Sequence, residues 1–346
     1  MTPTESAAGR LSALVDGYLT TQLIYVAAEL GLADAIGGED RDAAGLAAEV
    51  GADPAVLGRV LRGLAAAGVL DERPGRRFAL TAVGELLRAG DPRSMLGAVL
   101  ARGRLYYGAL AGLLTATRAG GTPFEITNGA PFFAHLAAHP AQEAAFQESM
   151  TARSRREAAA VVAACDFSRF DTLVDVGGGS GLLLTAILDA NPGLAGTLFD
   201  RPEVVARAAL PGVGGDFFTA VPAGADAYLL SRVVHDWDDD EAVTILRTCH
   251  RAMPGDATLL LVEALLPERA VDDPAAVRMD LHMLTLLHGR ERTRAEYAAL
   301  LDAAGFRLAE VLAAEPVSGV HVLEAHPIRA RRGSVTSAPG TSGARA

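Results

Sequence analysis

The sequence contains no lysine, and all 31 of its basic residues are arginine. This absence excludes covalent catalysis through a lysine Schiff base. Aromatic residues make up only 5% of the chain, so small and aliphatic residues must fill most of the core. The two cysteines, Cys165 and Cys249, are too few for a disulfide framework in a chain of 346 residues. We expect both to be small apolar core residues.

Long apolar runs and a basic leader are also missing. No run reaches the roughly 18 residues that a membrane span needs, and the polar N-terminus MTPTESAAGR lacks the pattern of a signal peptide. These features predict a cytoplasmic protein with no membrane partner. The formal net charge of −11 also disfavours nucleic acid as a partner, because an acidic chain repels phosphate backbones.

Residues 1–95 show the order helix, turn, helix and hairpin of a winged helix. Asp53 followed by Pro54 starts a helix that ends at Gly68, and two short strands around the turn RPGR follow. A winged helix that binds DNA is usually basic, but residues 1–100 carry 9 arginines against 13 acidic residues, a net charge of −4. We therefore interpret this domain as a mostly α-helical dimerisation domain. A DNA-binding ligand sensor is the alternative that this charge disfavours.

The remaining chain divides into three parts. Residues 96–165 are predicted to be a helical linker that contributes to a substrate pocket. Residues 166–328 alternate short apolar strands with polar or helical sequence, in the order DTLVDVGG, AGTLFD, ADAYLLS, TLLLVEA and finally HVLEAHP. This alternation predicts a doubly wound α/β domain, with a parallel sheet and helices on both faces. Residues 329–346 lack an apolar anchor and are expected to form a disordered tail.

The strongest local signal is LVDVGGGSG, residues 173–181. A buried strand delivers Asp175, and Gly177, Gly179 and Gly181 then allow a tight turn and close approach of a ligand. The helix that follows favours a negative group such as a carboxylate at its start. This spacing differs from the dinucleotide fingerprint. The acid at the strand end suits a cationic group, such as the ammonium of a methionine moiety.

Two further acids follow the next strands. Asp200 lies 21 residues after Gly179, where an acidic side chain meets the ribose of a bound nucleoside. Asp216 can accept from an adenine amino group, and Phe217 can cover an adenine face. This set predicts a ligand with ribose, adenine and a positive charge. It fits NAD less well, because the pyrophosphate of NAD is anionic.

His235 lies just past the carboxyl end of a strand, where open parallel sheets bind ligands. Glu263, in LLLVEA, and Glu291, in HGRERT, could orient His235 as a catalytic base. Several aspartates follow His235, but carboxylates at a helix start more often cap the helix than bind Mg²⁺. We therefore expect no metal site.

Taken in order, these motifs closely resemble the small-molecule O-methyltransferases of the plant caffeate and flavonoid type. Bacterial relatives of that family modify polyketides and other natural products. The resemblance covers about residues 11–326 and also includes the segment RMDLHMLTLLHGRERT. It implies a Rossmann-like methyltransferase domain, a homodimer formed through the first domain, and S-adenosylmethionine as methyl donor without a metal. It also implies a small aromatic acceptor and a role in antibiotic biosynthesis.

The motifs and the resemblance together assign three groups of residues. The catalytic group is His235 as base, flanked by Glu263 and Glu291. The donor site comprises Ser154, Asp175, Gly177, Gly179, Asp200, Asp216, Phe217 and Ser231. The acceptor pocket comprises Phe132, Phe146, Met150, Asp236 and Met283, with Phe133 beside them. Spacing alone would place Phe146 and Met150 in a plain helix core.

One position departs from the family pattern. Many plant members have a lysine where this chain has Ser231, so a hydroxyl, the backbone or water must meet the donor there. An alternative with the same fold also stays open, because some bacterial relatives use the bound donor for hydroxylation or decarboxylation. The intact set of His235, Glu263 and Glu291 favours methylation. Polyketide, naphthoate, phenolic amino acid and flavonoid acceptors all remain open.

Overall fold

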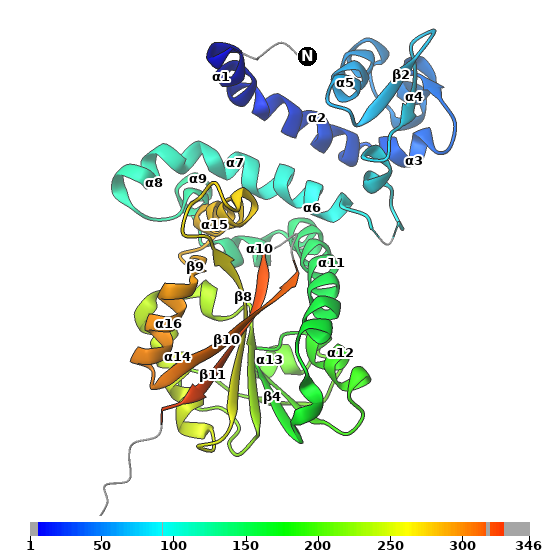
Figure 1. Ribbon diagram of the computed structural model, residues 1–346. Coiled ribbons are helices and arrows are strands. Elements are labelled where there is room, and N and C mark those ends of the chain that lie inside the picture. Colours follow the sequence, from blue (N-terminus) through cyan, green and yellow to red (C-terminus); the bar gives the residue numbers. More distant parts are fainter. Residues whose placement is uncertain (1–5, 92, 316–318, 329–346) are drawn as a thin grey trace, which may run out of the picture.

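The computed structural model describes residues 6–91, 93–315 and 319–328. The expected disordered tail at 329–346 lies outside the described residues. The described chain forms an N-terminal helical unit, a helical middle segment and an α/β domain, which follow one another from blue to red in Figure 1.

The N-terminal unit has the predicted order of helix, turn, helix and hairpin. Its elements are α1 (Ala7–Val15), α2 (Gly17–Glu29), α3 (Leu32–Ile36), β1 (Arg41–Asp42), α4 (Ala43–Val50), α5 (Pro54–Ala66), β2 (Leu70–Arg73), β3 (Arg77–Leu80) and the turn η1 (Gly84–Leu87). Asp53 caps α5 as predicted, and its side chain accepts hydrogen bonds from the backbone of Ala55 and Val56. β1 adds a third strand beside β3, which the sequence pattern did not indicate.

The first two helices leave an apolar surface uncovered in the single chain. Leu11, Leu14 and Val15 of α1 are each more than 60% exposed, at 63%, 70% and 64%. Tyr18 and Leu19 at the start of α2 are about half exposed. An exposed apolar stripe of this kind usually marks an interaction surface.

The middle segment is helical, as expected. It contains α6 (Leu96–Ala101), the π-helical turn η2 (Arg102–Tyr106), α7 (Tyr107–Ala109), η3 (Leu110–Gly112), α8 (Leu113–Ala119), α9 (Pro123–Asn128), α10 (Phe132–Ala138) and α11 (Pro140–Ala164). α11 packs against α6 at one end and against α12 and β10 of the α/β domain further along. This long helix therefore connects the upper helical layer to the sheet (Figure 1).

The α/β domain is built on one sheet with strand order β10-β11-β8-β7-β4-β5-β6. Its strands are β4 (Thr172–Val176), β5 (Ala195–Asp200), β6 (Gly212–Gly214), β7 (Ala227–Ser231), β8 (Thr258–Leu266), β10 (Phe306–Glu315) and β11 (Val320–Pro327), and β9 (Arg292–Thr293) pairs with the end of β8. Its helices and turns are η4 (Phe167–Arg169), α12 (Leu182–Ala190), α13 (Pro202–Val205), η5 (Val234–Asp236), α14 (Asp239–Ala252), α15 (Pro274–Leu286) and α16 (Arg294–Ala303).

The doubly wound fold is confirmed, and the four predicted repeats form parallel strands, but the edge beyond β8 is antiparallel, which the sequence did not indicate. The five strands from β4 to β8 run parallel, whereas β11 pairs antiparallel with both β8 and β10. β10 itself was not recognised from the sequence. The few residues between β10 and β11 cannot hold a crossover helix, so the chain must reverse direction there.

Two apolar clusters cover the two faces of the sheet. Tyr228 and Leu230 of β7 pack on the face of α14 and α16, whereas Leu229 packs on the face of α12 and α11. Burial on both faces is typical of parallel strands. The two cysteines lie in these clusters as predicted, and burial raises the pKa of Cys249 to about 12. No helix in the described part of the chain is long and apolar enough to cross a membrane.

Candidate active site

The glycine-rich loop connects the carboxyl end of β4 to α12. Gly177, Gly179 and Gly181 have φ angles of 73°, 58° and 78°, in the left-handed region that side chains disfavour. A Cβ atom at Gly177 would also lie 2.7 Å from the Cγ2 atom of Val233. Larger residues at these positions would therefore strain the loop or push it away from β7.

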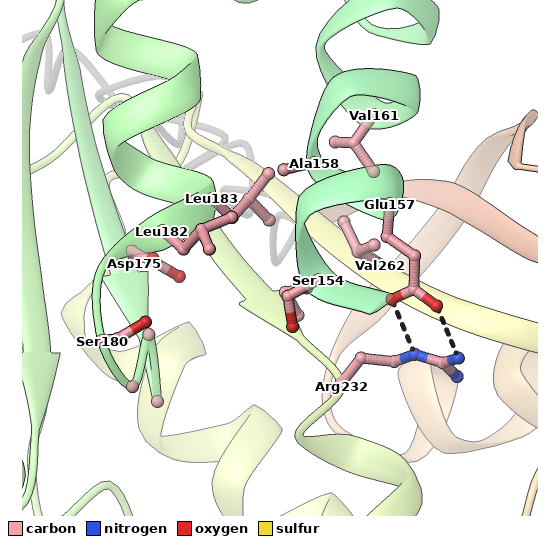
Figure 2. A pocket seen from close by; sticks show the side chains of 14 residues that line it. Ser154, Glu157, Ala158, Val161, Asp175, Ser180, Leu182, Leu183, Arg232 and Val262 are labelled. Atoms are coloured by element: carbon pink, nitrogen blue, oxygen red, sulfur yellow. Dashed lines mark hydrogen bonds and ion pairs between the residues drawn. The ribbon is translucent and has the colours of Figure 1, made fainter. Parts of the chain in front are cut away.

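A cavity of about 200 Å³ lies between this loop and α11 (Figure 2). Ser154, Asp175, Gly177, Gly179 and Ser231, which were assigned to the donor site, all line it. The cavity is also lined by Glu157, Ala158, Val161, Gly178, Ser180, Leu182, Leu183, Arg232 and Val262. The structure thus brings together residues from α11, the glycine loop and the ends of two neighbouring strands.

Asp175 is buried, and neither of its carboxylate oxygens has a hydrogen-bond partner among the described residues. Burial, and next the negative charge of Asp200, raise the pKa of Asp175 to about 7. An unpartnered buried carboxyl group is costly. A cationic ligand group in the cavity would supply the missing partner, so this observation fits the ammonium of a methionine moiety.

Asp200 lies at the end of β5 and holds the glycine loop. Its Oδ2 atom accepts a hydrogen bond of 2.9 Å from the backbone of Gly179, and its Oδ1 atom accepts one of 2.7 Å from Arg201. Asp216, further along the same edge, accepts from the backbone of Phe218. The ring of Phe217 lies close to Gly177 and packs edge-on against Trp237. Asp200, Asp216 and Phe217 therefore lie near the loop, outside the lining of the small cavity.

His235 lies in the short turn η5, after the end of β7, and is 6% exposed. Its Nδ1 atom is 3.2 Å from Oε1 of Glu291 and 3.7 Å from Oε2 of Glu263. Its Nε2 atom is 3.5 Å from Oδ1 of Asp236. Glu263 is within β8, which continues to Leu266, so it does not close that strand as the sequence suggested. The structure nevertheless brings all three predicted catalytic residues together.

The carboxyl groups control the charge of the imidazole. Burial by itself would lower the pKa of His235, but the charge of Glu263 and the hydrogen bond to Glu291 outweigh it and raise that pKa above its usual value. Burial in turn raises the pKa of Glu263. With Nδ1 bonded to Glu291, the Nε2 atom is the nitrogen left to exchange a proton with a ligand.

The backbone around His235 is held from the opposite side by the segment that precedes α16. Arg292, which is 0% exposed, donates to the backbone oxygens of Val234 and Trp237. The backbone N–H of Arg290 donates to the oxygen of His235 at 2.8 Å. A side chain at Gly289 would collide with that same oxygen. This contact requires glycine at position 289.

Asp238, Asp239 and Asp240 lie at the start of α14, as expected, whereas Asp236 lies in η5 beside His235. Asp238 caps α14 and accepts a hydrogen bond of 2.9 Å from the backbone of Glu241. Asp239 forms ion pairs with Arg290 and Arg292. These partners account for both carboxylates without a bound cation.

Sequence reasoning missed a line of ion pairs that ends at His235. Arg232 donates from Nη1 to Glu291 at 3.2 Å. It also donates from Nη2 to Glu157 at 3.2 Å, and Figure 2 shows this pair. Arg153 donates to Glu157 at 2.7 Å. Arg232 has a φ angle of 57°, which is uncommon for a residue with a side chain and turns the chain between β7 and η5. An arginine directly after a buried strand was the available signal.

The residues assigned to the acceptor pocket are divided between two places. Phe132 and Phe146 pack edge-on with ring centroids 5.0 Å apart, in a buried cluster that Met150 borders. Phe133 is 58% exposed, Met283 is buried, and Asp236 lies beside the imidazole of His235. A second cavity, of about 930 Å³, lies between α6, α11 and α15, and Met150 lines it.

Comparison with known proteins identifies the family. Residues 107–307 match the family model described as O-methyltransferase domain, and residues 12–90 match the O-methyltransferase dimerisation domain. The phenazine O-methyltransferase PhzM of Lysobacter antibioticus is 42% identical over 327 residues, which cover 91% of this chain and 95% of that protein.

Two solved structures show the same arrangement. The mitomycin 7-O-methyltransferase MmcR is 35% identical, with a TM-score of 0.84 and coverage of 93% of this chain and 98% of that one. CalO1, a methyltransferase in calicheamicin biosynthesis solved in its SAH-bound form, is 34% identical, with a TM-score of 0.82 and coverage of 93% and 98%. The chain therefore belongs to the O-methyltransferase family and is itself an O-methyltransferase, with an N-terminal dimerisation domain ahead of its methyltransferase domain.

Proposed function

We propose that this enzyme transfers a methyl group from S-adenosylmethionine to a hydroxyl of a small aromatic natural product, with His235 as the general base. One observation carries the proposal. A buried imidazole held by Glu263 and Glu291 lies at the same sheet edge as a glycine loop whose neighbouring Asp175 lacks a partner. The relatives PhzM, MmcR and CalO1 are named for phenazine, mitomycin and calicheamicin chemistry, which supports such an acceptor.

Each residue assigned to the donor site would bind a different group of the methyl donor. Asp175 would pair with the donor's ammonium, and Asp200 would accept from the ribose hydroxyls. Asp216 and Phe217 would contact the adenine. Ser154 and Ser231 line the cavity of about 200 Å³ and can offer their hydroxyls to the donor there. The fit rests on the unpartnered oxygens of Asp175 and on the open backbone of the glycine loop.

The chain must then align the acceptor and remove its proton. The donor supplies an electrophilic methyl group on a positively charged sulfur. Alignment of two reactants can contribute on the order of 7–11 kcal/mol. A phenol with a pKa near 10 and an ordinary histidine near 6.5 differ by about 3.5 units, or roughly 5 kcal/mol for full transfer. The raised pKa of His235 narrows this gap, and its Nε2 atom receives the proton.

We propose that the cluster of His235, Glu263 and Glu291 orients an imidazole rather than holding a metal ion. Their ligand atoms lie within 4.8 Å of one another, a spacing that a cation could use. However, Glu263 already accepts a hydrogen bond of 2.9 Å from the backbone of Val234, and Glu291 already pairs with the guanidinium of Arg232. A divalent cation would have to lie next to this positive charge.

We also propose that the enzyme works as a homodimer. The match of residues 12–90 to a dimerisation domain and the uncovered apolar residues of α1 support this assembly. Burial of such a surface against its copy would remove apolar area from water.

The proposed function is tested by incubating the enzyme with S-adenosylmethionine and a panel of phenols. We expect S-adenosylhomocysteine to form and one acceptor to gain the mass of a single CH₂ group. One relative, the aclacinomycin 10-hydroxylase RdmB of Streptomyces purpurascens, is 35% identical over 323 residues, so hydroxylation is the rival outcome. A product that gains one oxygen atom and no CH₂ group would contradict the proposal.

The pH dependence of the reaction should report the ionisation of His235. His235 must lose its proton before it can act as a base, and its pKa lies above the ordinary 6.5. We therefore expect kcat/KM for the acceptor to rise with pH through a midpoint above that value. Glu291→Gln removes a carboxylate that raises the pKa of His235, so the midpoint should move to lower pH.

A matched control for this experiment is Asp240→Asn, which removes the same charge from an exposed position at the start of α14. The midpoint of this variant should equal that of the unmodified enzyme. If Glu291→Gln and Asp240→Asn share one midpoint, Glu291 does not set the pKa of the base.

A further inference from the structure

The cavity of about 930 Å³ between α6, α11 and α15 has an uneven charge. Arg102, Arg153 and Arg155 line it, and Asp91 is its single acidic lining residue. Asp91 already forms an ion pair with Arg93 at 2.9 Å. The cavity therefore holds more positive than negative charge, although the chain as a whole carries a net charge of −11.

Arg102 has no acidic partner among the residues that the structure describes. Its Nη1 atom donates to the backbone oxygen of Ala98, one turn earlier. Burial lowers the pKa of Arg102; Tyr106 opposes this shift in part, and the positive charge of Arg153 adds to it. A partly buried guanidinium without a counter-ion is costly, and an anion from solution or from a ligand would offset that cost.

Not every N–H group of the Arg153 guanidinium has a hydrogen-bond partner. It pairs with Glu157 through Nε, but its Nη2 atom is buried and has no hydrogen-bond partner in the described chain. Glu157 also forms an ion pair with Arg232, so the guanidinium groups of Arg153 and Arg232 share one carboxylate. Arg102 thus retains donors for a negative group, and the guanidinium of Arg153 adds positive charge to the same cavity.

A neutral histidine also borders the two arginines. His282 of α15 also lines the cavity, and burial followed by the charges of Arg102, Arg153 and Arg278 lowers its pKa to about 4. His282 is therefore neutral at neutral pH. Its ring packs against that of Tyr106 with centroids 5.0 Å apart and the planes tilted by 59°, and both rings line the cavity beside the arginines.

The local backbone places Arg102 and Arg104 in different surroundings. Both belong to the π-helical turn η2, a rare geometry that often marks functional sites. Tyr25 of α2 packs directly against Gly103, where any side chain would collide with its ring. Arg104 pairs with Glu29 of α2, at 2.7 Å, while Arg102 lines the cavity.

We propose that Arg102 and Arg153 bind a carboxylate on the acceptor, so that the substrate class is an aromatic hydroxy acid. This inference rests on the proposed function. The ion pairs from Arg153 through Glu157, Arg232 and Glu291 lead directly to His235. In this proposal, an acceptor held by its carboxylate at the arginines packs beside Tyr106 and His282 and presents its hydroxyl to that imidazole.

The test compares two probes of equal size and different charge. The affinities of 6-hydroxy-2-naphthoate and of the neutral 6-hydroxy-2-naphthamide, whose hydroxyl lies at the opposite end of the ring system, are measured by calorimetry on the full protein loaded with S-adenosylhomocysteine. We expect the acid to bind at least about tenfold more tightly, as a charge-assisted bidentate contact does. Arg102→Gln should abolish this preference. Arg102→Lys retains the positive charge and should still bind the acid more tightly than the amide.

Arg104→Gln is the matched control, because it removes the same charge from the same turn outside the cavity. It should keep the full preference for the acid. Equal affinities of the two probes for the unmodified protein, binding of neither probe, or an equal loss in Arg104→Gln would overturn the proposal. If the amide is methylated while both probes bind equally, the carboxylate site fails and the proposed function stands.

Discussion

Replacing His235 by alanine is expected to lower turnover by on the order of a hundredfold or more, which is the usual contribution of a general base. The imidazole is the group that the cluster of Glu263, Glu291 and Asp236 surrounds. Alanine lacks this ring, so the Nε2 atom that takes the acceptor's proton is lost. The cavity proposed to hold the donor lies at the glycine loop and does not include His235 in its lining. The affinity for S-adenosylhomocysteine should therefore stay unchanged.

The measurement is steady-state turnover together with calorimetric binding of S-adenosylhomocysteine. His326→Ala is a suitable control, because this histidine is more than a third exposed and pairs with Glu324 at the end of the sheet. The control should retain full turnover. Equal turnover in His235→Ala and the unmodified enzyme would remove His235 from the role of base. Intact donor binding in His235→Ala also shows that the variant is folded.

Replacing Asp200 by alanine is expected to weaken donor binding by about ten- to a hundredfold, the range for hydrogen bonds to a charged group. Each oxygen of Asp200 accepts one backbone hydrogen bond, from Gly179 and from Arg201. A carboxylate oxygen can accept a second bond, so both oxygens have capacity left for ribose hydroxyls. The substitution removes these bonds and also the support of the loop at Gly179.

Calorimetric titration with S-adenosylhomocysteine measures this effect directly. Asp189→Ala is the matched control, since this exposed acid on α12 carries the same charge away from the loop. Its affinity should equal that of the unmodified enzyme. An unchanged affinity in Asp200→Ala would argue against the ribose assignment. A loss of turnover at saturating donor, with affinity unchanged, would point instead to a role on the acceptor side.

The sequence motifs were most informative where a residue type has few other uses. A glycine loop after a buried strand indicated both the proposed donor edge and the start of α12, because glycine adopts the observed positive φ angles with the least strain. Cap residues such as Asp53 located helix starts to within a residue. These features depend on neighbours in the chain, so a local pattern is sufficient to predict them.

Features that depend on distant segments were missed. The antiparallel edge formed by β10 and β11 has no signature apart from ordinary apolar residues, and its direction follows from the short connection between the strands. The ion pairs of Arg232 join β7 to α11 and to the loop of Glu291, across 75 and 59 positions of sequence. Nothing near Arg232 in the chain indicates such partners.

The sequence by itself therefore determined the order of the two domains, the doubly wound fold and the glycine loop, since short-range spacing encodes them, and it also indicated His235 as the proposed base. Only the tertiary structure decided which nitrogen of His235 bonds to Glu291, and that Arg102 has no acidic partner among the described residues. The physical reason is that the partners of a buried charged group come from distant parts of the chain. The effective charge of a buried group depends on every neighbour within a few ångströms. Folding brings Arg102, Arg153 and His282 into one cavity from three separate helical segments.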